Sequence, residues 1–515
     1  MTHHTPFTRL SRLILGLLLG TALLAGLLAQ LHATARAATA AVLDVCATCS
    51  YTTIQSAVDA ASPGDTVRVA AGTYQDVVTA SGLLSTTVLI TKDLTLLGGF
   101  SPDFQTHDPA TYVSTIDGQN SVKGIYVFGS QAHVAGFTIV NGLSHGVLVR
   151  SDFNGHPGGA TLAQNVIQHN AGTGIVFYQA SGEVLSSTVA HNLWEGVGAA
   201  EAHIRIADNV LTQNSLGGIW AGSAAITITG NTILSNTAEG GGGITLDNAA
   251  QFSVTHNLIQ GNQAQLYSGG GVLILGGAAG ILAQNDLVAN TATDHGGGIA
   301  VYQNGGVTLS RNELRLNSAV YGGGGIHVNA ENGSTLLTIS ENAIHDNTAE
   351  YATGVQVVNS SGDVLIDRND VRFNHATGPD YSAGGIHVDN ITGTVTVVNN
   401  VVAHNDNRGV KGVNYTEIVL INNTLVANGA VAIEMHAWPI TAAVPLTATL
   451  INNIIADHPD CAMVGCNGAV FGTRHNDVVG HDLDDCGATI VSETGGLNAD
   501  PLFVAAAQGD YRLAF

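Results

Sequence analysis

Short runs of alternating apolar and polar residues recur along most of the chain, and tight-turn residues separate them. In Ile226-Thr-Ile-Thr-Gly230, for example, every second residue before the glycine is apolar. Alternation with a period of two is typical of a strand that buries one face. The repeated part of the chain shows no apolar period of 3.6 residues, which a helix would need. The pattern therefore predicts many short β-strands joined by turns.

A six-residue motif, Asn-x-(Ile/Val/Leu)-x-x-Asn, marks a repeat. Its copies are about 26 residues apart, and a glycine-rich loop and another short strand, such as 241–247, follow many of them. Repeats of this length built from short strands predict the coils of a solenoid. Leucine-rich repeats share the period, but they require a dense Leu-x-x-Leu-x-Leu pattern. The copies begin at Asn165, Asn209, Asn231, Asn257, Asn285, Asn312, Asn342, Asn369, Asn400 and Asn423, with degenerate copies at Ser187 and Asn453.

We therefore expect an all-β fold, a single right-handed parallel β-helix of about 14 or more coils. Inward Ile, Val, Leu and Ala residues would form ladders between coils that stack about 4.8 Å apart. The asparagines would bond one another in a ladder at a tight bend, because Asn tolerates left-handed backbone. In the segment 51–61, Ile54, Ala57, Val58 and Ala61 have helical spacing. This segment predicts a short helix that caps the first coil.

The N-terminus predicts export. Arg9 and Arg12 precede the apolar run 13–31, and Ala35-Arg-Ala37 follows as a small-residue cleavage site. An uncleaved anchor helix is the alternative. Cleavage would give a secreted or cell-surface protein with no membrane span, and we expect a monomer. The predicted divisions are a signal peptide (1–37), an N-terminal cap (38–63), the β-helix (64–455) and a closing segment (456–515).

The five cysteines fall at the two ends of the chain. Cys46 and Cys49 lie in the cap, and Cys461, Cys466 and Cys486 lie in the closing segment. An exported protein can form disulfides, so we expect Cys46, Cys49, Cys461 and Cys466 to take part in them, with one odd thiol. The pairing does not follow from sequence.

Composition narrows the function. Of 515 residues, 64 are glycine, 45% are hydrophobic and only 11% are charged, which argues against a disordered chain. The formal net charge is −23, and loss of 1–37 would remove three arginines and no acids, giving −26. A nucleic-acid partner is excluded because the chain has no basic footprint. The same charge argues against anionic polymers as partners.

Several segments resemble known proteins. Thr53–Val69 with Gly72-Thr-Tyr74 resembles the entry segment of pectin-lyase-like right-handed β-helix proteins, and Leu96–Phe100, Thr115–Gly118 and Gly136–Asn141 resemble their early coils. Ala499–Val504 with Gly509–Leu513 is similar to the closing segment of choice-of-anchor Q proteins. The resemblance implies a secreted or surface bacterial β-helix. It does not imply one activity, since that superfamily includes lyases, hydrolases, epimerases and adhesins.

Enzyme signatures of the superfamily are not found. The chain lacks the Gly-His-Gly of polygalacturonases, the Arg-x-Pro-x-x-Arg of pectate lyases and the Asp-Pro-His-Asp of alginate epimerases. Asp294-His-Gly-Gly-Gly298 is the nearest look-alike, and it falls on a glycine loop of the repeat. A lyase base is often Lys or Arg, and the chain has only Lys92, Lys123 and Lys411. These observations favour binding over catalysis.

Aligning the repeats on their glycine loops predicts two outward columns along one face. Carboxylates, aromatic rings and imidazoles gather in these columns, as they do in sugar-binding grooves. The alternative is that they are ordinary solvated residues. The ligand-binding candidates are Trp220, Asp247, Tyr302, His327, Asn329, Gln356, His387 and Asp389.

Three functions remain open at this point. We prefer a surface that binds extracellular or cell-envelope glycans. A polysaccharide lyase or glycoside hydrolase acting on an acidic polysaccharide is the first alternative, and a structural adhesin is the second. The catalytic candidates for the enzyme are His327, His387, Asp389 and Tyr381, and a Ca²⁺ cofactor would be held by Asp380 and Asp389.

Overall fold

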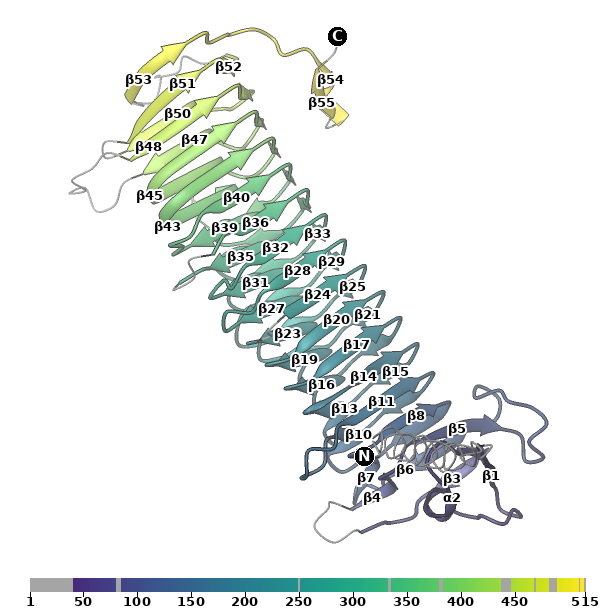
Figure 1. The fold of residues 1–515 in the computed structure, drawn as a ribbon. Helices are drawn as coiled ribbons and strands as arrows, with labels where there is room; N and C mark the ends of the chain where they lie inside the picture. The colour runs from purple at the N-terminus through teal and green to yellow at the C-terminus, as the bar shows by residue number, and fades with distance from the viewer. Residues whose placement is uncertain are drawn as a thin grey trace, which may run out of the picture. The chain divides into compact units, whose positions relative to one another are not determined.

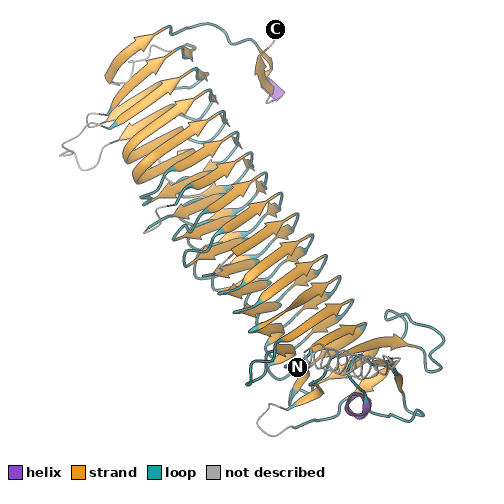
Figure 2. Ribbon diagram, in the orientation of Figure 1, coloured by secondary structure: helices purple, strands orange, loops and turns teal. Residues whose placement is uncertain are grey.

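Alternating short sequences fold into strands that stack coil upon coil in the computed structural model (Figures 1 and 2). The structure describes residues 40–79, 85–248, 251–331, 335–378, 383–436, 446–466, 469–480, 489–508 and 510–513. The fold is an all-β parallel solenoid of about 15 coils, as predicted. The signal-peptide prediction falls outside the described residues. No helix among those residues is long and apolar enough to cross a membrane.

Three long rows of parallel strands form the walls of the solenoid, which we call faces 1, 2 and 3. Faces 1 and 2 together make a 31-stranded sheet, because β43 (Ala383–Val398) and β45 (Arg408–Ile421) each run from one face into the other. The other strands of face 1 are β4 (Thr86–Ile90), β7 (Lys123–Phe128), β10 (His145–Arg150), β13 (Thr173–Tyr178), β16 (Val197–Ala200), β19 (Ile219–Gly222), β23 (Ile244–Asp247), β27 (Val272–Leu275), β31 (Ile299–Tyr302), β35 (Ile326–Asn329), β39 (Val355–Val358), β47 (Val431–His436) and β50 (Cys461–Cys466).

The other strands of face 2 are β1 (Val42–Val45), β2 (Thr66–Ala70), β5 (Leu94–Phe100), β8 (Gln131–Ala135), β11 (Gly158–Ala163), β14 (Ala180–Leu185), β17 (His203–Ala207), β20 (Ala225–Thr229), β24 (Gln251–Thr255), β28 (Gly280–Ala283), β32 (Val307–Ser310), β36 (Leu337–Ser340), β40 (Val364–Asp367), β48 (Thr447–Ile451), β51 (Val470–Arg474) and β53 (Thr489–Thr494).

Face 3 is a 16-stranded sheet. Its strands are β3 (Gly72–Tyr74), β6 (Ser114–Asp117), β9 (Phe137–Val140), β12 (Val166–Gln168), β15 (Thr188–Ala190), β18 (Val210–Thr212), β21 (Thr232–Leu234), β25 (Leu258–Gln260), β29 (Asp286–Val288), β33 (Glu313–Arg315), β37 (Ala343–His345), β41 (Asp370–Arg372), β44 (Val401–Ala403), β46 (Thr424–Val426), β49 (Ile454–Ala456) and β52 (Asp477–Val478). A smaller sheet at the turn from face 3 to face 1 contains β22 (Thr237–Ala238), β26 (Gln263–Ala264), β30 (Thr291–Ala292), β34 (Ser318–Ala319), β38 (Thr348–Ala349) and β42 (His375–Ala376).

The interior is a single apolar core that runs through the stack. Inward residues such as Ile244, Ile299 and Ile326 are completely buried, and each lies beside its counterpart on the next coil. Burying a Val, Leu or Ile side chain contributes about 1.5–3 kcal/mol, so the repeated ladder is the main source of stability. The predicted inward ladders are confirmed.

Two asparagine ladders flank the strands of face 3. Asn290 shows the geometry: its Nδ2 donates to Asn317 Oδ1 on the next coil (3.0 Å) and to the Ile259 carbonyl on the preceding coil (2.9 Å). Its Oδ1 accepts from both nitrogens of Asn262. A buried amide is tolerated only when its polar atoms are bonded, and the ladder provides all of these partners.

The left-handed backbone falls on the residue before each asparagine rather than on the asparagine. Gln164 precedes Asn165 with a φ of 53°, and His169 precedes Asn170 with a φ of 55°. The sharp bend is therefore made by an exposed residue, while the next residue, the asparagine, points inward and is hydrogen-bonded there. This corrects the expectation that Asn is used for its own left-handed conformation.

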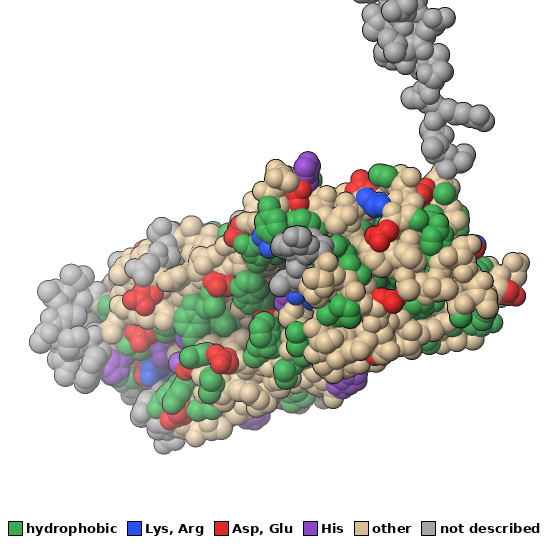
Figure 3. All heavy atoms as spheres, turned by 90° about the horizontal axis from the view of Figure 1, so that it is seen from below, with side chains coloured by type: hydrophobic (Ala, Val, Ile, Leu, Met, Phe, Trp, Pro, Cys, Tyr) green, Lys and Arg blue, Asp and Glu red, His purple; other side chains and the backbone are tan. Residues whose placement is uncertain are grey.

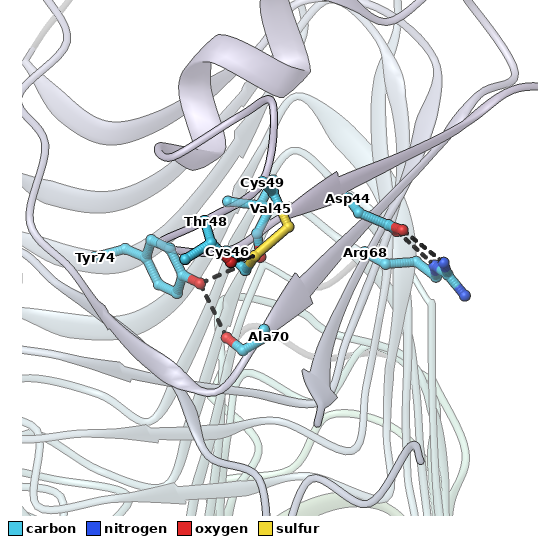
Figure 4. Close-up of a disulfide and its surroundings, with 8 residues drawn as sticks. All are labelled: Asp44, Val45, Cys46, Thr48, Cys49, Arg68, Ala70 and Tyr74. Atoms are coloured by element: carbon cyan, nitrogen blue, oxygen red, sulfur yellow. Dashed lines mark hydrogen bonds and ion pairs between the residues drawn. A yellow bond between two sulfur atoms is a disulfide. The ribbon is translucent and has the colours of Figure 1, made fainter. Parts of the chain in front are cut away.

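The N-terminal cap closes the first coil, as predicted. Helix α2 (Ile54–Ala60) has Thr53 as its N-cap, and the Thr53 side chain accepts from the Ser56 N–H. The helix buries Ile54 and Val58 against the coil below. Beside it, Cys46 and Cys49 form a disulfide (Figure 4).

Two further contacts hold the cap against β2. The Tyr74 hydroxyl bridges the two: it lies 3.5 Å from the Val45 carbonyl in the cap and donates to the Ala70 carbonyl of β2 (3.0 Å). Arg68 forms a two-pronged ion pair with Asp44 at 2.8 Å (Figure 4). The disulfide therefore closes a loop within the cap, and the ion pair and the Tyr74 hydroxyl hold the cap against the first coils.

At the other end, parallel stacking continues past residue 455 as far as β53. After β53 the chain forms an antiparallel hairpin of β54 (Phe503–Ala505) and β55 (Asp510–Leu513), with the 3₁₀ turn η1 (Ala506–Gln508) between them. Tyr511 in this hairpin packs on Ala403, Val426 and Ala456 of face 3 and hydrogen-bonds to His404. The division into cap, helix and closing segment stays a prediction.

Candidate functional site

Strand pairing on face 1 determines which residues share a column. Successive pairings place one set of outward residues in line, the first column, and another set two residues further along each strand, the second column. Both have the register predicted from the glycine loops. The first column contains Trp220, Thr245, Leu273, Ala300, His327, Gln356 and His387, and the second contains Gly222, Asp247, Leu275, Tyr302, Asn329, Val358 and Asp389.

Much of the first column is buried although it points away from the core. Leu273, Ala300 and His327 are each less than 7% exposed, because the glycine loop of the same coil folds over them. A Cβ on Gly296 would lie 2.7 Å from the Ala300 Cβ, and a Cβ on Gly323 would lie 2.6 Å from the His327 Cβ. Both glycines also have a positive φ, of 65° and 63°. The glycine runs thus let the loop lie flat on the first column.

A network of polar side chains joins the glycine loop to the second column. Ser268 Oγ donates to Asp294 Oδ2 (3.0 Å) and lies 2.7 Å from the Tyr302 hydroxyl. Asp294 Oδ1 lies 2.8 Å from His295 Nδ1. Burial raises the pKa of Tyr302 above its ordinary value. Sequence reasoning identified Tyr302 and missed Ser268, whose only signal is its place just before a glycine run.

His327 lies beneath this network and is neutral at ordinary pH. Burial lowers the pKa of His327 to about 3, and the neighbouring His295, whose ring centroid is 4.4 Å away, acts in the same direction. His327 Nδ1 lies 2.8 Å from Gln356 Oε1, so these two predicted ligand-binding residues bond each other. The buried His327 ring supports Tyr302, whose centroid lies 5.5 Å away.

A pocket of about 470 Å³ opens along the second column. Three of the predicted ligand-binding residues line it: Asp247, Tyr302 and Asn329. Leu275 of the second column lines it as well, and sequence reasoning missed the remaining residues because they lie at the bend after the strand, where no column was aligned. No basic side chain lines the pocket. The complete lining is Asp247, Asn248, Leu275, Gly276, Tyr302, Gln303, Asn329 and Glu331.

Face 2 carries hollows of about 490 and 390 Å³, and both are of a different character. In the larger hollow the charged side chains Arg205 and Glu183 lie 3.7 Å apart and largely neutralise each other, and the smaller hollow is lined by a single carboxylate, Asp93. Thr, Ser, Gln and His residues make up most of the outward lining. The pocket on face 1 instead combines a half-buried aromatic ring, Tyr302, with two carboxylates and no basic side chain in its lining, so we take it as the candidate binding site.

The first column continues into the late coils, where charged groups gather. In the strand register, His387 lies beside Lys411, and Lys411 lies beside Glu434. Glu434 accepts from Arg408 Nε (2.7 Å) and lies 3.4 Å from Lys411 Nζ. Burial by itself would raise the pKa of Glu434, but the two cations hold it below the ordinary value. We call His387, Asp389, Arg408, Lys411, Glu434 and Cys466 the late-coil cluster.

Two polar atoms of the late-coil cluster are buried without a hydrogen-bond partner among the described residues: His387 Nε2 and Asp389 Oδ1. Burial lowers the pKa of His387 to about 3, with a further contribution from Lys411, and burial raises the pKa of Asp389. A neutral imidazole and an unbonded carboxylate oxygen near Lys411 could bind a polar ligand or move a proton. Sequence reasoning found His387 and Asp389 and missed their partners.

The remaining predictions have mixed outcomes. Trp220 is half-buried, and its ring lies over Gly222, where a Cβ would come within 2.5 Å of it. Tyr381, Asp380 and Cys486 lie outside the described residues. In the part of the chain that the structure describes, no three His, Cys, Asp or Glu side chains are grouped to hold a metal ion.

The disulfide prediction is wrong at one residue. Cys46 and Cys49 are paired, and Cys461 is disulfide-bonded. Cys466, which was also expected to be bonded, is a free thiol at the end of the second column. Burial raises the pKa of this thiol, and Glu434 adds to the effect. The thiol therefore stays protonated beside the other members of the late-coil cluster.

Comparison with solved structures finds parallel β-helices of low identity. Pectate lyase Pel9A is 16% identical, with a TM-score of 0.36 and coverage of 62% of this chain and 78% of that chain. The periplasmic alginate epimerase AlgG is 11% identical, with a TM-score of 0.23 and coverage of 79% and 78%. Tailspike protein 3 of bacteriophage CBA120 is 9% identical, with a TM-score of 0.30 and coverage of 87% and 58%. No curated protein matches the sequence significantly.

A family model described as "Right handed beta helix region" matches residues 123–292, 243–371 and 287–498. These overlapping stretches extend from the coil of β7 to the coil of β53, well over half of the chain. The matches contain the strands that form the pocket and the late-coil cluster. The chain therefore belongs to the right-handed β-helix family.

Proposed function

We propose that this protein is exported and binds an extracellular or cell-envelope glycan on the outward side of face 1. The observation that carries the proposal is the pocket on the second column. It offers one aromatic edge, from Tyr302, beside the carboxylates of Asp247 and Glu331 and the amide of Asn329. Sugars are held by an aromatic surface against the ring and by polar groups that bond the hydroxyls. The sequence pattern of 1–37 supports export.

The pocket is held in shape from below, which suits binding more than it suits catalysis. Tyr302 is fixed by Ser268 at its hydroxyl and by His327 at its ring. His327 is in turn bonded to Gln356. A side chain that is already in place loses little rotamer freedom when a ligand arrives, and affinity gains from that preorganisation.

The test is equilibrium binding of the secreted protein to a panel of soluble polysaccharides, followed by calorimetry on any that bind. We expect binding that weakens when Asp247→Asn or Glu331→Gln is introduced. The matched control is Asp286→Asn, because Asp286 is an exposed carboxylate on face 3. A panel without any binder, or binding that Asp247→Asn and Asp286→Asn affect equally, would contradict the proposal. Attachment to cells without glycan binding would favour a structural adhesin.

A second candidate function is a polysaccharide lyase or glycoside hydrolase, and the late-coil cluster favours it. His387 Nε2 and Asp389 Oδ1 are unbonded among the described residues, and Lys411 lies beside His387 in the strand register. Against catalysis, Lys411 already lies 3.4 Å from Glu434, so it would have to leave this carboxylate before acting as a base. An imidazole with a pKa of about 3 is also a weak proton acceptor.

Incubation with pectate, alginate and related polyuronates, with and without Ca²⁺, tests the second candidate. Unsaturated or reducing ends that vanish in His387→Ala, while Asp247→Asn retains them, would establish the enzyme. If the wild-type protein binds these polymers or neutral glycans and releases no product, the result would favour the binding function over the enzyme.

A further inference from the structure

Large apolar side chains lie exposed in a row at the turn between face 3 and face 1. They are between 41% and 61% exposed, although a soluble chain could have placed polar residues at every turn. Contiguous exposed apolar surface of this kind marks an interaction site. The residues are Leu193, Trp194, Leu216, Leu266, Tyr267, Val320 and Tyr321.

Backbone hydrogen bonds between coils show that these residues follow one another along the stack. The Leu216 N–H donates to the Trp194 carbonyl (3.3 Å). Further along, the Tyr267 N–H donates to the Glu239 backbone carbonyl (2.7 Å), and the Tyr321 N–H donates to the Asp294 backbone carbonyl (3.0 Å). Two apolar coils therefore come first, and from Glu239 onward acidic and apolar coils alternate. We call the seven apolar residues, together with Glu239 and Asp294, the ridge.

The ridge is long, and it runs in the stacking direction. It begins just before β16 and ends just before β35, which are linked by five successive strand pairings. At about 4.8 Å for each pairing, its length is about 24 Å. A partner that uses the whole ridge must be extended along the stack rather than across it.

We propose that the ridge binds an uncharged, hydroxyl-rich polysaccharide that lies lengthwise along the stack, an inference that rests on the proposed glycan-binding function. Trp194, Tyr267 and Tyr321 offer flat faces to sugar rings. Between them, the carboxylates of Glu239 and Asp294 can accept hydrogen bonds from hydroxyl groups. The ridge thus offers both stacking and hydrogen-bonding groups, and each unit of a sugar polymer presents ring faces and hydroxyls together.

Charge selects against an anionic polymer. The ridge contains two acidic and no basic side chains, and the pocket nearby contains Asp247 and Glu331 with no basic residue. The whole chain carries a formal charge of −23. More acidic than basic side chains are also visible on the face shown in Figure 3. A polyuronate would meet repulsion along its full length.

Charge also disfavours a second copy of the chain as the partner. Two ridges packed against each other would bury Glu239 of both copies, which forms no ion pair among the described residues, whereas Asp294 would keep His295 beside it. A buried carboxylate without a partner is strongly unfavourable. A neutral sugar polymer leaves these carboxylates hydrogen-bonded and partly hydrated, so it suits the ridge better.

The experiment measures binding of the full secreted protein to size-defined oligosaccharides of a neutral glucan and of a polyuronate. We expect neutral oligomers to bind with an affinity that rises with their length until they span the ridge. Trp194→Ala, Tyr267→Ala and Tyr321→Ala should each weaken binding by about 2- to 12-fold. Phe153→Ala is the matched control, since Phe153 is a strongly exposed ring away from the ridge. Glu239→Gln should improve polyuronate binding.

The outcomes separate this inference from the proposed function. If Asp247→Asn abolishes binding and the ridge variants leave it unchanged, the proposed role of the ridge is overturned and the proposed glycan-binding function stands. Tighter binding of polyuronates than of neutral oligomers, or no dependence on length, would also overturn it. If no glycan binds the wild type, the proposed function fails and the inference fails with it.

Discussion

Replacing Asn290 by alanine should destabilise the protein far more than the loss of a small side chain suggests. Asn290 is completely buried, and its amide makes four hydrogen bonds to three neighbours. The substitution leaves the Asn262 backbone N–H without its acceptor and the Ile259 carbonyl without this donor. Each unsatisfied buried group costs about 1–3 kcal/mol, so we expect a loss of about 2–6 kcal/mol in the free energy of unfolding.

Urea denaturation followed by circular dichroism measures this loss, and hydrogen exchange of peptides from the coils of β25, β29 and β33 locates it. The matched control is Asn154→Ala, because Asn154 is exposed. A second variant, Asn290→Asp, should be more destabilising at neutral pH than at acid pH, since a carboxylate would face the oxygens of Ile259 and Asn317. Equal denaturation midpoints for Asn290→Ala and Asn154→Ala would refute the reasoning.

Three further predictions concern titratable groups. The His345 ring lies between the carboxylates of Glu313 (2.6 Å) and Asp346 (2.7 Å). Burial opposes the charge of the ring, but the bonds to these carboxylates raise the pKa of His345 above its ordinary value. The stability that the charged ring contributes is therefore full below about pH 6.5 and is lost as pH rises through the folded pKa. His345→Asn should therefore lose less stability than the wild type between about pH 6 and pH 9 in urea titrations. His327 behaves oppositely, because burial lowers its pKa to about 3. Holding this ring neutral at about pH 4.5 should lower the free energy of unfolding by about 2–3 kcal/mol. His327→Gln should therefore reduce the loss of stability that the wild type shows on acidification. Glu434→Gln leaves two buried cations without their carboxylate and should cost about 3–5 kcal/mol. It should also speed alkylation of Cys466 at a given pH, because Glu434 raises the pKa of that thiol; an unchanged alkylation rate would count against the assigned contact.

The fold and the register of face 1 could be predicted because both depend on periodic burial. Inward and outward residues alternate strictly in a strand, so one glycine loop aligned correctly places every residue that follows it. His327 shows where this reasoning stops. Its direction was predicted correctly, but a side chain that points outward can still be buried when a loop lies on it, and the path of a loop does not follow from the period of a strand.

The late-coil cluster was only half predicted for a related reason. The alignment relied on glycine loops and ended at Ile386, because the next coils lack the loop and continue as the long strands β43 and β45. Extending the same column by two coils would have reached Lys411 and Glu434. Arg408 lies outside both columns and reaches Glu434 only through its long side chain, which a sequence register cannot show.

The asparagine ladders give the stack a direction. In each ladder the amide of one coil donates to the oxygen of the following coil, and the backbone N–H of the same asparagine does so too. A coil that has just formed therefore presents two unfilled donors at each asparagine, ready for the segment that comes next in the chain. During synthesis from the N-terminus, with the first coil already closed by α2 and a disulfide, each coil can serve as the template for its successor. The ladders thus favour vectorial folding, in which order spreads from the capped end toward the C-terminus.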